Sequence, residues 1–257
     1  MALISCELFS ESLMRATTVT VILPQATEEQ IGLVDQPLEG PPPVLYLLHG
    51  LSDDHTAWQR YTSIERYAVA RGLAVVMPAV DRSFYANEAH GHRYWDWVSE
   101  ELPRLVGDFF NVSRTREDTF VAGLSMGGYG ALKLGFTHPD RFAAVASLSG
   151  VARIQGLVTD LPRPEIVDRV FGGDIRPSDD ILALLGAGDP AALPALYVGC
   201  GTEEELLLAQ NRQLVEAATD KGLDVTVDFR PGVHEWKLWD AQIQDVVEWL
   251  PVRSSED

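Results

Sequence analysis

The sequence is short of cysteine and of long apolar runs. Its 257 residues include only two cysteines, Cys6 and Cys200, far apart in the chain. Two distant cysteines do not make a disulfide framework, so we expect reduced thiols and a cytoplasmic location. No run of about 18 apolar residues occurs, so no membrane-spanning segment is predicted. The first residues also lack the basic start and long apolar stretch of a signal peptide.

Basic residues are few compared with acidic ones. Lys and Arg total 20 and Asp and Glu total 38, which gives a formal net charge of −18. Nucleic acids and anionic lipid surfaces attract proteins rich in Lys and Arg, so we expect neither nucleic acid nor membrane as a partner. Hydrophobic residues make up 46% of the chain, which is enough for a substantial core and excludes disorder.

Residues of metal-ligand type gather at positions 53–55 and 90–92. Neither group has the helical i, i+4 spacing or a convincing third ligand, so we predict no metal site and no cofactor. Asp53 and Asp54 are expected instead to cap the helix that follows them.

Apolar runs and helical patterns alternate along the chain. Strands are predicted over residues 17–23, 44–48, 73–77, 120–123, 143–147, 196–199 and 224–229, and helices over 63–71, 95–110, 128–137, 204–221 and 240–250. This rhythm is typical of an α/β fold, with a mostly parallel central sheet flanked by helices. We therefore predict one domain over residues 1–257. Residues 151–193 interrupt this alternation of strands and helices. We predict that they form a small cap or lid, with a peripheral excursion of the chain as the alternative.

The most informative motif is G-x-S-x-G at residues 123–127, with Ser125 at its centre. A predicted strand precedes it and a predicted helix follows it. That context is what a nucleophile elbow requires, because a sharp turn lifts the serine hydroxyl clear of the sheet edge. Side chains at positions 123 and 127 would collide where strand and helix nearly touch, so glycine is expected at both. Ser125 is the candidate nucleophile.

A serine hydroxyl needs a base to take its proton, and in this fold class the base follows the serine in the chain. Only His138 and His234 come after Ser125. His138 lies at the end of the elbow helix, which carries it away from the active edge of the sheet. His234 lies in the loop after the last predicted strand, where open α/β sheets place their sites. His234 is therefore the candidate base.

The third member of a triad is an acid that holds the histidine. It is expected after the strand over 196–199, where Glu203, Glu204 and Glu205 follow one another. All three stand at a predicted helix start, where the helix dipole favours acids in any case. The residues alone leave the choice among them open.

A tetrahedral intermediate also needs two backbone N–H donors. One is predicted at Met126, the residue after the nucleophile, and the other at Leu51, in the loop after the strand over 44–48. His49 is expected to support that loop rather than act as a base. Trp58 and Trp236 lie near the two site loops and are candidates for shaping the acyl pocket.

Residues 47–52, 123–130 and 234–236 together resemble the tributyrin esterase branch of the esterase D family, in the α/β-hydrolase superfamily. The resemblance spans nearly the whole chain. It implies an α/β-hydrolase fold, no cofactor, hydrolysis of short-chain acyl esters including aryl esters, and a homo-oligomer. In that family the triad acid is an aspartate three residues after the glycine of the strand-end motif. The matching position here is Glu204, a carboxylate one methylene longer.

The predicted function is therefore a serine carboxylesterase that acts on a small-molecule ester through an acyl-enzyme. A thioesterase of the S-formylglutathione hydrolase type and a sugar-ester deacetylase are the alternatives. An acyltransferase and a non-catalytic binding protein on a hydrolase fold are weaker alternatives. The binding protein is disfavoured because no triad or oxyanion element is missing from the sequence.

Overall fold

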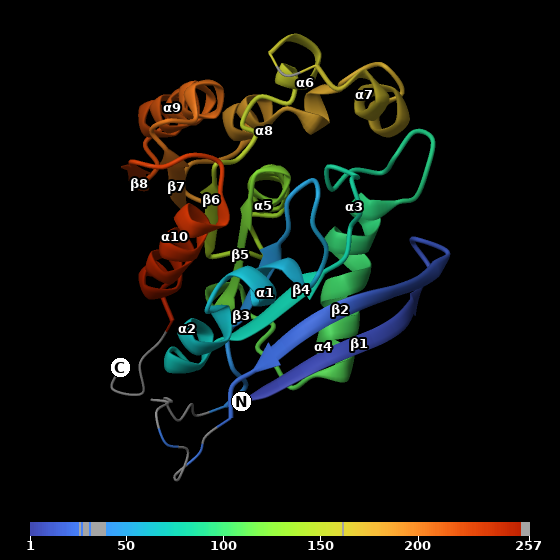
Figure 1. Ribbon diagram of the computed structural model, residues 1–257, viewed down its shortest axis with the longest axis vertical. Coiled ribbons are helices and arrows are strands. Elements are labelled where there is room, and N and C mark those ends of the chain that lie inside the picture. The colour runs from blue at the N-terminus through green and yellow to red at the C-terminus, as the bar shows by residue number, and fades with distance from the viewer. Residues whose placement is uncertain (26, 28–30, 32–39, 161, 253–257) are drawn as a thin grey trace.

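A single eight-stranded sheet runs through the part of the chain that the structure, a computed structural model, describes: residues 1–25, 27, 31, 40–160 and 162–252 (Figure 1). Its strands are β1 (Ala2–Ser10), β2 (Arg15–Leu23), β3 (Val44–Leu48), β4 (Ala74–Pro78), β5 (Thr119–Leu124), β6 (Ala144–Leu148), β7 (Ala195–Gly201) and β8 (Val225–Arg230). The spatial order is β1-β2-β4-β3-β5-β6-β7-β8. Only the β1–β2 and β2–β4 pairs are antiparallel, which confirms the prediction of a mostly parallel sheet.

Helices connect the strands and cover both faces of the sheet. They are α1 (Ala57–Tyr61), α2 (Ile64–Ala70), α3 (Tyr94–Asp96), the π-helix η1 (Trp97–Glu101), α4 (Leu102–Phe109), the short 3-10 helix η2 (Arg116–Asp118), α5 (Met126–Thr137), α6 (Gly156–Thr159), α7 (Pro164–Phe171), the 3-10 helix η3 (Pro177–Asp179), α8 (Ile181–Ala187), α9 (Glu205–Asp220) and α10 (Trp236–Trp249). Among the helices described, none is both long and apolar enough to cross a bilayer.

Side-chain alternation along the strands divides the interior into two cores. In β3, Val44, Tyr46 and Leu48 face the core beneath α4, α5 and α9. Leu45 and Leu47 face the opposite core, beneath α1, α2 and α10. Strands buried on both faces read as continuous apolar runs, which is why β3 and its parallel neighbours were predictable from local sequence.

Several elements depart from the sequence prediction. Strand β1 was not predicted, because it is an edge strand whose side chains are mostly exposed or half-buried. Helix α10 begins at Trp236, four residues before the predicted start. Helix α7 was also missed, although Pro164 opens it and Gly172 ends it with φ of 65°. Pro at a helix start and Gly just past its end are recognised signals.

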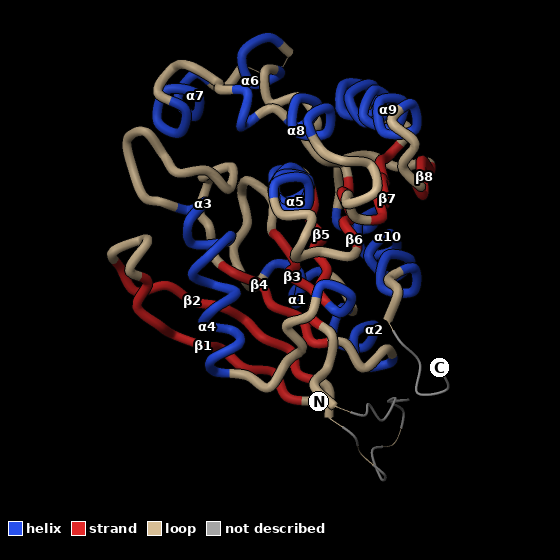
Figure 2. Tube along the Cα trace, turned by 180° about the vertical axis from the view of Figure 1, so that it is seen from behind, coloured by secondary structure: helices blue, strands red, loops and turns tan. Residues whose placement is uncertain are grey.

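The segment over residues 151–193 folds into α6, α7, η3 and α8, which gather at one end of the molecule in both views (Figures 1 and 2). It is fastened to the elbow helix α5 by two polar contacts. The Tyr129 hydroxyl donates to the Asp179 carbonyl at 2.9 Å, and Lys133 Nζ lies 2.7 Å from Asp179 Oδ1. Lys133 also lies 4.7 Å from the centroid of the Trp95 ring. The segment over residues 151–193 is therefore held against α5 by a buried ion pair.

Candidate active site

Ser125 occupies the turn between β5 and α5 in a strained backbone conformation. Its φ of 53° and ψ of −114° lie where residues with a side chain are uncommon. The Ser125 N–H donates to the Leu148 carbonyl at 2.8 Å, and the Ser125 carbonyl accepts from Tyr129 and Val151. These bonds offset the strain and fix the serine at the carboxyl end of the sheet.

The two glycines of the motif allow a close approach of backbone segments. A Cβ on Gly127 would lie 2.3 Å from the carbonyl oxygen of Leu48 and 2.7 Å from that of His49. A Cβ on Gly123 would lie 2.4 Å from the Gly127 carbonyl group. The collision predicted from sequence is therefore confirmed. The missing side chains let the N-terminus of α5 lie directly against the loop that follows β3.

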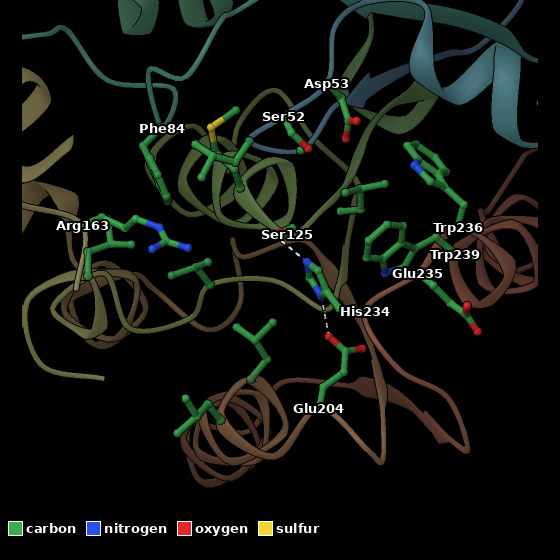
Figure 3. Close-up of a pocket in the computed structure, with 18 of the residues that line it drawn as sticks. Ser52, Asp53, Phe84, Ser125, Arg163, Glu204, His234, Glu235, Trp236 and Trp239 are labelled. Atoms are coloured by element: carbon green, nitrogen blue, oxygen red, sulfur yellow. Dashed lines mark hydrogen bonds and ion pairs between the residues drawn. The ribbon is translucent and has the colours of Figure 1, made fainter. Parts of the chain in front are cut away.

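A continuous hydrogen-bond chain joins Ser125, His234 and Glu204 (Figure 3). Ser125 Oγ lies 3.1 Å from His234 Nε2, and His234 Nδ1 lies 2.5 Å from Glu204 Oε2. A carboxylate accepts and cannot donate, so Nδ1 carries the proton and Nε2 presents its lone pair to the serine hydroxyl. This tautomer is the one that can take the serine proton.

Glu204 is nearly enclosed, with its side chain only 3% exposed. Besides His234, it accepts from the Ser149 hydroxyl at 2.6 Å and from the Gly201 N–H at 2.9 Å, both at Oε1. Burial raises the pKa of the Glu204 carboxyl, but the hydrogen bonds from His234 and Ser149 outweigh burial and hold that pKa below its ordinary value. The Glu204 carboxyl is therefore ionised, as an acid that orients a histidine must be.

The structure selects Glu204 from the three consecutive glutamates. Glu203 and Glu205 are exposed, whereas Glu204 is buried against the histidine. The loops after β7 and β8 are tied together by backbone bonds, including one from the Glu203 N–H to the Gly232 carbonyl at 3.1 Å. A Cβ on Gly201 would lie 2.3 Å from that same carbonyl oxygen. This close packing of the two loops decides which carboxylate reaches His234.

The two predicted oxyanion donors, Leu51 and Met126, both lie on the cavity wall beside Ser125. Within the part of the chain that the structure describes, neither backbone N–H donates to a protein acceptor. His49 braces the loop: its Nδ1 donates to the Gly50 carbonyl at 2.7 Å and its Nε2 accepts from the Val80 N–H at 3.1 Å. Burial lowers the pKa of His49, so it stays neutral in this structural position.

A cavity of about 1040 Å³ opens over Ser125. Its apolar wall includes several residues that the sequence did not single out: Phe84, Leu124, Val151, Leu157 and Trp239. Trp236 lines the cavity as expected, but Trp58 does not. Trp58 is 1% exposed, donates its indole N–H to the Leu48 carbonyl at 3.0 Å, and packs edge-on behind Trp236. Trp58 therefore lies behind the cavity wall, and its place in the sequence gave no sign of this position.

The remaining candidate residues lie outside the hydrogen-bond chain. His138 ends α5 and stacks on Trp95, with ring centroids 5.7 Å apart. Burial raises the pKa of the Cys200 thiol to about 12, which makes that thiol unreactive. The prediction that Asp53 and Asp54 cap the next helix is wrong, because Thr56 is the N-cap of α1 and no side-chain bond caps that helix. Asp54 instead accepts from the Thr56 N–H at 2.8 Å in the preceding turn, and Asp53 lines the cavity. Among the described residues, no group of His, Cys, Asp and Glu is arranged to hold a metal ion.

Comparison with known proteins places this site in a family. Residues 10–250 match the family model described as "Putative esterase". The chain belongs to this esterase family. The acetyl esterase of Caldicellulosiruptor saccharolyticus is 30% identical over 97% of this chain and 98% of its own length.

Two solved structures from Staphylococcus aureus resemble this esterase closely. One is the substrate-bound fluorophosphonate-binding serine hydrolase F, with a TM-score of 0.87 and 34% identity. The other is an S-formylglutathione hydrolase without ligand, with a TM-score of 0.82 and 34% identity. Each alignment covers 97% of this chain and 98% of the other. This esterase therefore has the α/β-hydrolase fold and is a serine carboxylesterase.

Proposed function

We propose that this esterase hydrolyses short-chain acyl esters, including aryl esters, with Ser125, His234 and Glu204 as its catalytic triad. The observation that carries the proposal is the hydrogen-bond chain from Ser125 Oγ through both ring nitrogens of His234 to a buried, ionised carboxylate. The substrate is a small molecule that enters the cavity over Ser125.

The reaction proceeds through an acyl-enzyme. Ser125 Oγ attacks the ester carbonyl carbon while its proton passes to His234 Nε2, and the carbonyl oxygen becomes an oxyanion held by the N–H groups of Leu51 and Met126. The C–O bond to the alcohol then breaks, and His234 gives its proton to the departing oxygen. Water next attacks the acyl carbon, again losing its proton to His234. Release of the carboxylic acid returns that proton to Ser125.

The proposed preference for short acyl chains rests on sequence similarity to related esterases and not on the size of the cavity. The similar Caldicellulosiruptor saccharolyticus protein is an acetyl esterase. Sequence motifs around Ser125 and His234 resemble the tributyrin esterase branch of the esterase D family. We assign the chain to that branch as part of the proposal.

A thioester substrate is the second candidate. It is favoured by the similarity to the Staphylococcus aureus S-formylglutathione hydrolase at 34% identity, equal to that of the fluorophosphonate-binding hydrolase. The same triad cleaves an ester or a thioester, because both proceed through the same acyl-serine. Turnover of S-formylglutathione against a matched oxygen ester distinguishes the two candidates.

We also propose a domain organisation, an oligomeric state and a cellular compartment for this esterase. The chain is one domain in which residues 151–193 act as a small cap, supported by the contacts of Asp179 with α5. The exposed side chains of Leu3, Phe9 and Met14 on the β1–β2 hairpin support a homo-oligomer. The free thiols of Cys6 and Cys200 support a reducing compartment, the cytoplasm.

Hydrolysis of 4-nitrophenyl esters from acetate to decanoate tests the function. We expect kcat/KM to fall as the acyl chain lengthens and the Ser125→Ala variant to lose at least about 10⁴-fold in kcat. Fluorophosphonate labelling of the wild type but not of the variant would locate the nucleophile, and equal melting temperatures would show that the variant is folded. Equal turnover by both proteins would refute the mechanism.

A further inference from the structure

Arg163 is the only Lys or Arg among the described residues that line the catalytic cavity. Its side chain extends from the start of α7 toward the space over Ser125 (Figure 3). The ion pairs within the described part of the chain do not include Arg163, although acidic residues outnumber basic ones by 18 across the sequence. A guanidinium without an acidic partner in so acidic a chain has its donors available to a ligand.

The backbone of Arg163 is fixed while its side chain is exposed. The Arg163 N–H donates to the Leu157 carbonyl at 2.8 Å, and the Arg163 carbonyl accepts from Ile166 and Val167, each at 3.0 Å. Pro164 follows at the first turn of α7. The chain thus holds the base of this side chain at the rim of the cavity, on the segment proposed as the cap.

The other charges around the cavity have the opposite sign. Asp53, Glu203, Glu205 and Glu235 all line it, together with Glu204 of the triad. Asp53 and Glu235 lie on the side of Ser125 away from Arg163 in Figure 3. A substrate with a negative group is repelled by the acidic side and attracted to Arg163, so the charge arrangement sets one direction of binding.

We propose that Arg163 forms an anion subsite, so that this esterase prefers esters carrying a carboxylate several bonds from the ester carbonyl. The inference rests on the proposed function of Ser125 and names a substrate class for it. Guanidinium binds carboxylate through two parallel N–H···O bonds, which fixes orientation as well as adding affinity. The carboxylate can belong to the acyl group or to the departing alcohol, and the experiment separates these two sources.

Two matched pairs of substrates test the subsite. Mono-4-nitrophenyl glutarate against 4-nitrophenyl pentanoate places the charge on the acyl side. The 4-acetoxybenzoate anion against its methyl ester places the charge on the leaving group. The variants are Arg163→Gln and Arg163→Lys, with Arg153→Gln as the control. Arg153 belongs to the same segment and its loss changes the net charge equally, but it does not line the cavity.

We expect Arg163→Gln to lower kcat/KM for the charged member of at least one pair by about tenfold, mainly through KM, with the neutral member within about twofold. Arg163→Lys should recover part of the loss, and Arg153→Gln should change neither ratio. The pair that responds identifies which side of the ester bears the carboxylate. Charged-to-neutral ratios that stay constant in both pairs would overturn the subsite. Neutral esters that the wild type fails to cleave would instead refute the proposed function.

Discussion

The Ser149 hydroxyl donates to Glu204 Oε1 across 2.6 Å, on the oxygen that His234 does not use. Ser149 itself accepts from the indole N–H of Trp239 at 3.1 Å and stands at φ of 47°, a conformation unusual for serine. A buried chain from Trp239 through Ser149 therefore stabilises the ionised form of Glu204. This chain of hydrogen bonds lies behind the proposed triad and holds the Glu204 carboxylate in place.

Replacing Ser149 by alanine should change the pH dependence of catalysis. The folded-state pKa of Glu204 is depressed, so the ionised carboxylate persists as pH falls until that depressed value is reached. Loss of the Ser149 hydrogen bond raises this pKa, so Ser149→Ala should lose kcat/KM at a higher pH than the wild type does. At neutral pH we expect a loss of about tenfold.

The control for that experiment is Ser147→Ala. Ser147 is also buried, and its hydroxyl has no hydrogen-bond partner among the described atoms. The same chemical change two residues away should leave the pH profile in place. Superimposable profiles for Ser149→Ala and the wild type would show that Ser149 does not tune Glu204.

Gly127→Ala should both destabilise the fold and displace the loop after β3, which carries the proposed oxyanion donor Leu51. The added Cβ would lie 2.3 Å from the Leu48 carbonyl oxygen and 2.7 Å from that of His49. Both oxygens belong to the backbone, so neither can rotate away as a side chain could. We expect a loss of about 1–3 kcal/mol in unfolding free energy and a lower kcat. Gly186→Ala is the control, because a Cβ there meets no atom within 4 Å and lies in helix α8. Urea denaturation should show Gly186→Ala stabilised by about 0.5–1 kcal/mol.

Glu101→Gln should weaken the attachment of the β1–β2 hairpin. Glu101 accepts from the Ser10 hydroxyl at 2.7 Å and from the N–H groups of Glu11 and Ser12, each at 2.9 Å. Burial raises the pKa of Glu101, but these hydrogen bonds hold it below its ordinary value. Its ionised form therefore stabilises the fold above the ordinary pKa of glutamate, and this stabilisation is lost as pH falls through the depressed value.

We expect Glu101→Gln to cost about 1–3 kcal/mol at pH 7, with the difference from wild type shrinking in acid. Urea denaturation from pH 7 down to about pH 3, well below the ordinary glutamate value of about 4.3, measures this. Glu100→Gln is the adjacent control, since Glu100 is 59% exposed beside Arg141 and should cost at most about 0.5 kcal/mol. A difference that is the same at every pH would rule out the ionised carboxylate as its source.

The buried pair of Lys133 and Asp179 should show strong coupling. Their side chains are 6% and 8% exposed, and burial lowers the pKa of Lys133 although Asp179 opposes that shift. Asp179→Leu alone leaves the buried Lys133 charge without its ion-pair partner, which costs about 3–5 kcal/mol. Lys133→Met leaves the buried Asp179 carboxylate with only the exposed Arg176, whose Nε lies 3.9 Å away. The double variant should cost less than the sum by at least about 2 kcal/mol. A double-mutant cycle by urea denaturation measures this, and additive costs would contradict it.

Local sequence determined the regular core of the fold. The run over residues 44–48 became β3 with the same bounds, and the run over 120–123 became the centre of β5. Continuous apolar strands and the G-x-S-x-G turn are local signals, since each depends on residues adjacent in the chain. Strand β1 and helices α6 and α8 carry weaker local signals, because they depend on the neighbours against which they pack.

The sequence by itself therefore determined the elbow, the order of Ser125 and His234 along the chain, and the sheet that carries them. The resemblance to the esterase family indicated Glu204 among the three consecutive glutamates. Only the tertiary structure shows why Glu204 and neither neighbour reaches His234, because that depends on how the loops after β7 and β8 pack. The same holds for Trp58, which lies behind Trp236, and for Arg163, which faces the cavity. Distances between residues far apart in the chain are fixed by packing, and no local pattern encodes them.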